Sequence, residues 1–183
     1  DLTADVRNWV KSEGVTPRVV QVGNEMRPGM RWEEEVALSG ASYDVMECDV
    51  KGSNSTSEEV KYRENFANLA AFINVGYDAV KSVFDDAIVI VHLDNGYDNE
   101  LYTWFFNELK ANGGKWDMIG MSLYPYWTML EHKEYTADRT ITECIANINS
   151  VARKYNCDVM VVETGMECAD DKGNLASASV LAE

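Results

Sequence analysis

The hydrophobic positions of the chain follow two different spacings. In four segments apolar residues recur every three or four positions, which is typical of helices packed on a core: residues 2–13, 62–80, 101–112 and 140–151. Four short apolar runs rich in β-branched residues predict buried strands: residues 19–23, 87–93, 118–124 and 159–162. Gly14 and Gly113 predict the ends of two helices, and the spacing of Thr140 and Glu143 predicts a capping box that begins the last helix.

The order of these elements predicts an α/β fold. Helices that alternate with short apolar strands form parallel βα units, with the helices covering the sheet. Either an open doubly wound sheet or a (β/α)8 TIM barrel would fit this order. Neither a G-x-G-x-x-G turn nor a Walker A motif follows a strand, which disfavours the doubly wound sheet. Polar and aromatic residues follow every predicted strand, as they do at the active face of a barrel, so we favour the barrel.

Composition and charge narrow the range of partners. The 183 residues are 46% hydrophobic and 26% charged, a balance that predicts a packed domain over residues 1–183. The net charge of −15 argues against duplex nucleic acid and anionic membranes, and it is compatible with a neutral ligand such as a sugar. No apolar run is longer than that of residues 87–91, which is too short to cross a bilayer. The four cysteines lack close spacing, so unpaired thiols are favoured over two disulfides.

Two glutamates stand directly after predicted strands, Glu25 after the first and Glu163 after the fourth. Because the carboxyl ends of barrel strands meet at one rim, we expect these carboxylates to converge. A retaining glycosidase uses such a pair about 5 Å apart: one protonates the leaving oxygen and the other attacks the anomeric carbon. The two positions lie 138 residues apart. With roughly 31 residues in a barrel unit, that is three units plus one long polar loop, predicted at residues 33–57.

Four strings, in order along the chain, resemble glycoside hydrolase family 53, the endo-β-1,4-galactanases. They are Val20-Gln21-Val22-Gly23-Asn24-Glu25 with Gly29-Met30-Arg31-Trp32, then His92-Leu93-Asp94-Asn95-Gly96, Ser122-Leu123-Tyr124-Pro125-Tyr126-Trp127 and Val161-Val162-Glu163-Thr164-Gly165. The Asn-Glu pair is shared by the whole clan of retaining barrel glycosidases. The second and third strings are more specific to this family.

This resemblance implies that the chain carries strands 4 to 7 of the barrel and is part of a longer catalytic domain. Glu25 would be the acid/base and Glu163 the nucleophile. Asn24 would bind the sugar 2-hydroxyl, and Tyr124 would orient the nucleophile.

The remaining candidates are substrate contacts. The resemblance implies that His92 and Asp94 line the sugar site, and Trp32 and Trp127 are candidate stacking platforms. Structural alternatives stay open for two of them: His92 as a histidine bonded to neighbouring backbone, and Asp94 as a cap of the following helix.

We therefore expect a secreted or cell-surface glycoside hydrolase that cleaves β-1,4-galactan of arabinogalactan with retention, using no cofactor and no metal. A related β-1,4-mannanase, xylanase or glucanase and a non-catalytic carbohydrate-binding fragment remain as alternatives. A metal-dependent hydrolase is disfavoured because the two histidines, His92 and His132, lie 40 residues apart without a His-x-His motif.

Overall fold

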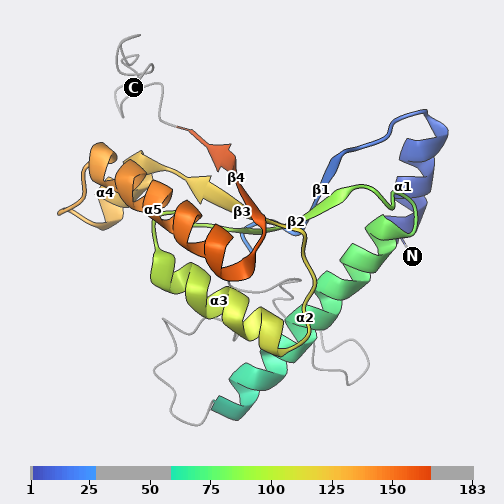
Figure 1. Cartoon of the computed structure of the whole chain (residues 1–183), viewed down its shortest axis with the longest axis horizontal. Coiled ribbons are helices and arrows are strands. Elements are labelled where there is room, and N and C mark those ends of the chain that lie inside the picture. The colour runs from blue at the N-terminus through green and yellow to red at the C-terminus, as the bar shows by residue number, and fades with distance from the viewer. Residues whose placement is uncertain (1, 28–58, 166–183) are drawn as a thin grey trace, which may run out of the picture.

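The structure, a computed structural model, describes residues 2–27 and 59–165. These residues form one parallel sheet of four strands with five helices (Figure 1). The strands are β1 (Val19–Val22), β2 (Ile88–Leu93), β3 (Met118–Leu123) and β4 (Asp158–Thr164). The helices are α1 (Leu2–Ser12), α2 (Glu59–Lys81), α3 (Asn99–Ala111), α4 (Pro125–Glu131) and α5 (Ala137–Tyr155).

The sheet order confirms the predicted fold class. Each strand pairs in parallel with the next strand along the chain, in the order β1-β2-β3-β4. A doubly wound sheet reverses this order at its switch point, whereas a barrel keeps it around the ring. The four strands and their helices are therefore an α/β unit that matches part of a (β/α)8 barrel.

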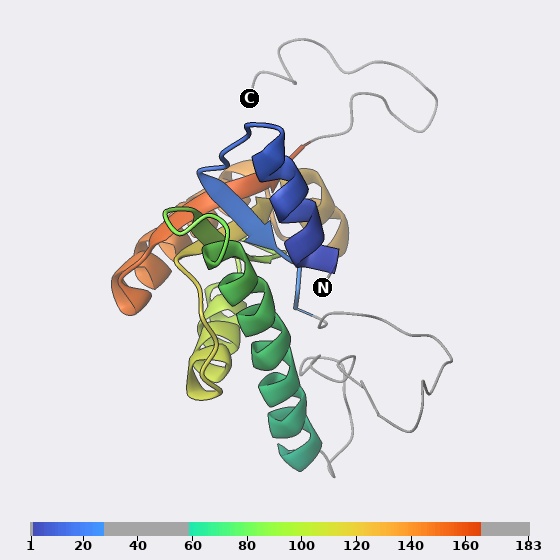
Figure 2. The same ribbon diagram turned by 90° about the vertical axis from the view of Figure 1, so that its right-hand side faces the viewer.

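The helices cover one face of the sheet. Contacts run in series from α1 to α2, from α2 to α3 and from α3 to α5, so the helices form a layer along the strands, seen from the side in Figure 2. Residues facing this layer alternate along the strands and join the hydrophobic core: Val91, Leu93, Ile119, Met121, Val159 and Val161. The intervening residues, among them His92, Gly120 and Ser122, point to the opposite face. The chemistry of this chain lies on that second face.

Two predicted strands are less buried than expected. β2 and β3 are almost fully buried, whereas β1 and β4 alternate between exposed and half-buried residues. Val19 in β1 is 37% exposed and Met160 in β4 is 41% exposed. The prediction of buried strands was wrong for this outer pair, because each has one neighbouring strand among the described residues.

The start of the last helix was also predicted wrongly. α5 begins one turn earlier than expected, because Thr136 caps it by accepting a hydrogen bond from the Arg139 N–H at 3.2 Å. Thr140 is instead fully buried in the first turn and donates to the Thr136 carbonyl at 2.9 Å. The sequence reasoning missed α4, although Pro125 directly after β3 is a typical first residue of a helix.

Several predictions fall on residues 28–58 and 166–183, which lie outside the described residues. They concern Trp32, the long loop at residues 33–57, Cys48 and Cys168. Cys144 and Cys157 are free, in agreement with unpaired thiols, and burial raises the pKa of both. Among the helices of the described residues, none is both long and apolar enough for a membrane span.

Candidate active site

Glu163 reaches the site through an irregularity in strand pairing. Met121 pairs with Val161, but the next residue, Ser122, pairs with Glu163, so Val162 is skipped. Strict alternation would turn Glu163 toward the helices, on the face of Val161. The one-residue shift brings its side chain to the face of Ser122, as β-bulges do beside active sites. The structure thus places Glu163 within the end of β4 rather than directly after a strand, as the sequence had suggested.

Glu25 is positioned by a tight turn after β1. Gly23 has φ +77° and Glu25 has φ +43°, so both adopt the left-handed backbone region that favours glycine. A glutamate in this region is uncommon, and such conformations cluster at functional sites. The next residue, Met26, is fully buried and its N–H donates to the His92 carbonyl at 3.0 Å, which ties the turn to β2.

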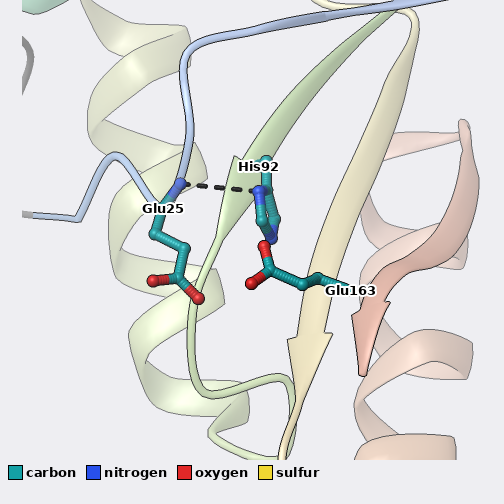
Figure 3. Close-up of side chains that lie close together, drawn as sticks. All are labelled: Glu25, His92 and Glu163. Atoms are coloured by element: carbon teal, nitrogen blue, oxygen red, sulfur yellow. Dashed lines mark hydrogen bonds between the residues drawn. The ribbon is translucent and has the colours of Figure 1, made fainter. Parts of the chain in front are cut away.

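The two carboxylates converge as predicted. One carboxylate oxygen of Glu25 and one of Glu163 lie within 4.8 Å of each other. Figure 3 shows the two side chains pointing toward each other from opposite sides, with His92 beside them. Carboxyl groups about 5–5.5 Å apart suit a retaining double displacement, whereas an inverting reaction needs roughly 6.5–9.5 Å to admit a water molecule. The separation therefore favours retention.

Tyr124 holds the Glu163 carboxylate. Its hydroxyl donates to Glu163 Oε1 at 2.6 Å. This hydrogen bond, followed by burial and by the charges of Glu163 and Glu25, raises the pKa of Tyr124 to about 12. The phenol consequently stays protonated and remains a donor at any pH near neutrality. The partnership that the family resemblance implied between these two residues is present in the structure.

His92 and Ser122 lie beneath Glu25. His92 is fully buried and Ser122 is 1% exposed. The Ser122 hydroxyl donates to Glu25 Oε1 at 2.6 Å, and His92 Nε2 lies 2.8 Å from the same hydroxyl oxygen. Burial lowers the pKa of His92, against the opposite effect of the charges on Glu163, Glu25 and Asp94. A neutral imidazole therefore sits under the acid/base candidate.

The opposite edge of the His92 ring meets the turn after β1. Its Nδ1 lies 3.0 Å from Gln21 Nε2 and 3.4 Å from the Glu25 backbone nitrogen. Asn24 Oδ1 accepts from Gln21 Nε2 at 3.1 Å and lies 3.2 Å from the same ring nitrogen. Asn24 itself is exposed beside the carboxylate pair. Contact of His92 with a sugar stays a prediction, and full burial favours the structural alternative.

A hollow of about 330 Å³ opens over the carboxylates. Its lining includes Glu25, Glu163, Asp94, Tyr124 and Trp127, and the Trp127 side chain is 51% exposed. We call it the catalytic hollow. An exposed indole beside paired carboxylates is suited to stack on the apolar face of a sugar. Trp32, the second candidate platform, lies outside the described residues.

Asp94 is held by an ion pair that the sequence reasoning did not predict. The Arg27 guanidinium binds both carboxylate oxygens, with Nε at 3.0 and 2.9 Å and a terminal nitrogen at 2.7 Å. Asp94 does not cap the following helix; Asp98 does so by accepting from the Leu101 N–H at 2.9 Å. Asp94 thus keeps its place at the catalytic hollow with its geometry fixed.

The donors Glu25, His92 and Glu163 are near enough to one another to suggest a metal ion. Both ring nitrogens of His92 already have hydrogen-bond partners, Ser122 on one side and the β1 turn on the other. A metal would have to displace one of these bonds, so we assign no metal ligands here.

Three residues of the site escaped the sequence reasoning: Gln21, Arg27 and Ser122. Gln21 and Ser122 are polar residues inside apolar strands, and Ser122 lies two positions before Tyr124, which directly follows β3. That signal was available. The sequence could not indicate the partner of Arg27, because only the fold brings the turn after β1 next to the end of β2.

Comparison with known proteins gives consistent matches along the whole chain. The sequence model of glycosyl hydrolase family 53 matches residues 1–182. An uncharacterized protein of Niallia circulans is 33% identical over 162 residues, covering 88% of this chain and 37% of its own length. The arabinogalactan endo-β-1,4-galactanase of Thermothelomyces thermophilus is 25% identical over 168 residues, covering 88% of this chain and 40% of its own. The chain thus spans well under half the length of these relatives.

Two solved structures share the fold. One belongs to a study of two fungal β-1,4-galactanases, with a TM-score of 0.66 and 23% identity, covering 98% of this chain and 46% of that one. The other is a catalytic domain from Ignisphaera aggregans, with a TM-score of 0.63 and 20% identity, covering 92% of this chain and 38% of that one.

Proposed function

This chain belongs to glycosyl hydrolase family 53, and from that membership we propose that the protein cleaves β-1,4-linked galactan by a retaining double displacement. The observation that carries the proposal is the approach of the Glu25 and Glu163 carboxylates to within 4.8 Å on one rim of the sheet. Two carboxylates at that separation can act on the two faces of a single anomeric carbon.

Glu163 is the nucleophile in this proposal. Its ionised carboxylate attacks the anomeric carbon, and the electron pair of the breaking bond moves to the leaving oxygen. The Tyr124 hydroxyl donates to Glu163 Oε1 at 2.6 Å and so orients the carboxylate. Because the pKa of Tyr124 is raised to about 12, the hydroxyl stays protonated and Glu163 stays the acceptor of this bond. The product of this step is a covalent glycosyl-enzyme.

Glu25 is the acid/base. It gives its proton to the leaving oxygen in the first step and, as a carboxylate, removes a proton from water in the second. Water then attacks the anomeric carbon and releases Glu163. The net stereochemistry is retention because two inversions occur at the same carbon.

The substrate contacts follow from the lining of the catalytic hollow. Trp127 offers a stacking face and Asp94 offers carboxylate acceptors for sugar hydroxyls. Asn24 is not among the lining residues, but it is exposed and directly precedes Glu25. Trp32, which lies outside the described residues, is a candidate for a second stacking face. We propose these four as sugar-binding residues.

Internal cleavage of a polymer requires room for several sugars. A second hollow, of about 1000 Å³, adjoins the catalytic hollow and shares Asn95, Tyr97 and Glu131 with it. Two adjoining hollows of these sizes fit an extended chain better than a terminal sugar. It supports an endo-acting enzyme on the galactan of arabinogalactan.

The remaining proposals concern context. We propose that residues 1–183 are part of a catalytic (β/α)8 barrel domain of a longer protein, with strands β1 to β4 in the places of barrel strands 4 to 7. We also propose that the protein acts outside the cell or at its surface, since a polysaccharide substrate is too large to be taken up intact.

The test is chemical rescue in the full-length protein. Glu163→Ala should lose cleavage of galactan, and added azide should restore turnover of an activated β-galactoside as the α-galactosyl azide, because azide fills the place of the missing carboxylate. Glu13→Ala, on an exposed residue directly after α1, is the matched control and should keep full activity. Near-normal cleavage by Glu163→Ala would remove Glu163 from this role.

Substrate preference is tested separately. Release of reducing ends from galactan, and not from mannan, xylan or β-1,4-glucan, would support the galactanase proposal over its clan relatives. Binding of galactan oligosaccharides without any turnover that depends on Glu163 would favour a non-catalytic carbohydrate-binding protein instead.

A further inference from the structure

A chain of hydrogen bonds begins and ends at Glu25. The Glu25 backbone N–H reaches His92 Nδ1 at 3.4 Å, His92 Nε2 reaches the Ser122 hydroxyl oxygen at 2.8 Å, and Ser122 donates to Glu25 Oε1 at 2.6 Å. The left-handed backbone of Glu25, with φ +43°, turns its N–H toward the imidazole. Glu25 and Ser122 line the catalytic hollow, and both intermediate side chains, His92 and Ser122, are buried.

The direction of this chain is fixed at one end. A backbone N–H can only donate, so His92 Nδ1 is an acceptor, and the Gln21 side-chain amide lies 3.0 Å from the same ring nitrogen. Burial keeps the imidazole neutral, so its single proton is on Nε2. That N–H donates to the Ser122 oxygen, and the Ser122 hydroxyl proton therefore points to Glu25 Oε1.

Asn24 offers the competing arrangement. Its Oδ1 lies 3.2 Å from His92 Nδ1 and would accept a proton carried there. In that tautomer His92 Nε2 would accept from Ser122, and the Glu25 backbone N–H would face another N–H. Gln21 Nε2 has two hydrogens and three acceptors within reach, the Gly23 carbonyl at 2.9 Å, Asn24 Oδ1 at 3.1 Å and His92 Nδ1 at 3.0 Å, so it fits either tautomer. The Glu25 backbone N–H, which can only donate, favours the unprotonated Nδ1.

We propose, on the basis of the proposed function, that His92 and Ser122 are positioning residues that place the transferable proton of Glu25 on Oε2. Oε1 accepts the Ser122 proton whether the carboxyl is ionised or neutral, because the carbonyl oxygen of a carboxylic acid is still an acceptor. The acid proton is thereby directed to the second oxygen. The same bond holds the carboxyl plane, so that oxygen keeps a fixed direction toward the leaving group.

The first test reads the tautomer of His92 directly. In the full-length protein, 15N NMR should show His92 with a protonated Nε2 and an unprotonated Nδ1 from about pH 7 to pH 8, with the signal assigned by its loss in His92→Gln. A proton on Nδ1, or an imidazolium that forms within this range, would overturn the proposal. The measurement needs no substrate, so its outcome is independent of whether the protein cleaves galactan.

The second test separates positioning from folding. Ser122→Ala should lower kcat/KM by about tenfold to hundredfold for galactan and for galactosides with poor leaving groups, which need the proton. It should change kcat/KM less than about threefold for a dinitrophenyl galactoside, whose departure needs no acid. Ser82→Ala, an exposed serine whose hydroxyl donates to the Ala79 carbonyl, is the control and should change neither.

A structural role for Ser122 would give a different pattern. Equal losses with good and poor leaving groups in Ser122→Ala would contradict the proposal, as would unchanged activity with both. If Ser122→Ala does not fold, the NMR measurement on the unaltered protein still decides the direction of the chain. If no glycosidase activity exists at all, the NMR result stands and the proposed function fails separately.

Discussion

Removing one hydroxyl tests the role of Glu163 with little change in shape. In Tyr124→Phe the hydrogen bond of 2.6 Å to Glu163 Oε1 is lost, while the ring that lines the catalytic hollow stays. Glu163, the proposed nucleophile, then loses the donor that fixes its direction. We expect slower formation of the glycosyl-enzyme and little change in the binding of substrate.

The size of the effect follows from the kind of bond. A hydrogen bond to a charged group contributes about 1.5–3 kcal/mol. If that contribution is realised in the transition state, kcat/KM should fall roughly 10- to 150-fold, since about 1.4 kcal/mol corresponds to one factor of ten. The short distance and the pKa of Tyr124, raised to about 12 chiefly by this bond, place the effect in the upper part of that range.

The matched control is Tyr77→Phe. Tyr77 donates to Asp117 Oδ1 at 2.8 Å, the same bond between a tyrosine and a carboxylate, next to the start of β3 at the opposite end of the sheet. Steady-state hydrolysis of galactan oligosaccharides and urea unfolding would be measured for both variants. A fall in kcat/KM within twofold for Tyr124→Phe, or equal falls in both variants, would refute the assignment of Tyr124 to the nucleophile.

Three further predictions concern stability. Gly120→Ala should destabilise the fold by about 1–3 kcal/mol and disturb the site. The added Cβ would lie 2.7 Å from Ile90 Cγ2 and 3.3 Å from His92 Cβ. Urea unfolding that shows no loss of stability would contradict this packing. Thr136→Ala should lower the free energy of unfolding by about 1 kcal/mol in the same assay, because it removes the cap of α5. Thr142→Ala, on the exposed part of that helix, is the control and should not change stability. Equal losses of stability in the two variants would refute the role of Thr136 as the cap. Among the described residues, four tyrosines have pKa values raised to about 12 from an ordinary value of 10: Tyr77, Tyr97, Tyr124 and Tyr155. Because the unfolded chain loses these protons first, the free energy of unfolding should fall between pH 10 and 12, after a smaller decline that begins near pH 9, where the unfolded chain loses the protons of Cys144 and Cys157. A fall that is complete below pH 10 would contradict this prediction.

Much of the fold could be predicted because it depends on local spacing. Four short β-branched runs gave four parallel strands, and the absence of a phosphate-binding turn favoured the barrel over the doubly wound sheet. The limits of α5 were missed because two threonines one turn apart can each cap a helix, and only packing decides between them. The exposure of β1 and β4 depends on which strands lie beside them, which local sequence does not encode.

The pair of glutamates could also be predicted, since each follows or ends a strand and parallel strands share one rim. The contacts that position the residues of the site could not be predicted from the sequence. Glu163 faces the site only because Val162 is skipped in the pairing of β3 and β4, and Asp94 is held by Arg27 from a different turn. The hydrogen-bond chain through His92 and Ser122 joins residues 30 positions apart, so it becomes visible only in three dimensions.

The most direct test of the account is to trap the glycosyl-enzyme. An activated 2-deoxy-2-fluoro-galactoside forms the covalent intermediate and slows its hydrolysis, so mass spectrometry of the digested full-length protein should find the sugar on the peptide that contains Glu163, bound to that side chain. A label on any other residue, or a hydrolysis product of inverted anomeric configuration with no label, would contradict the assignment of the two carboxylates.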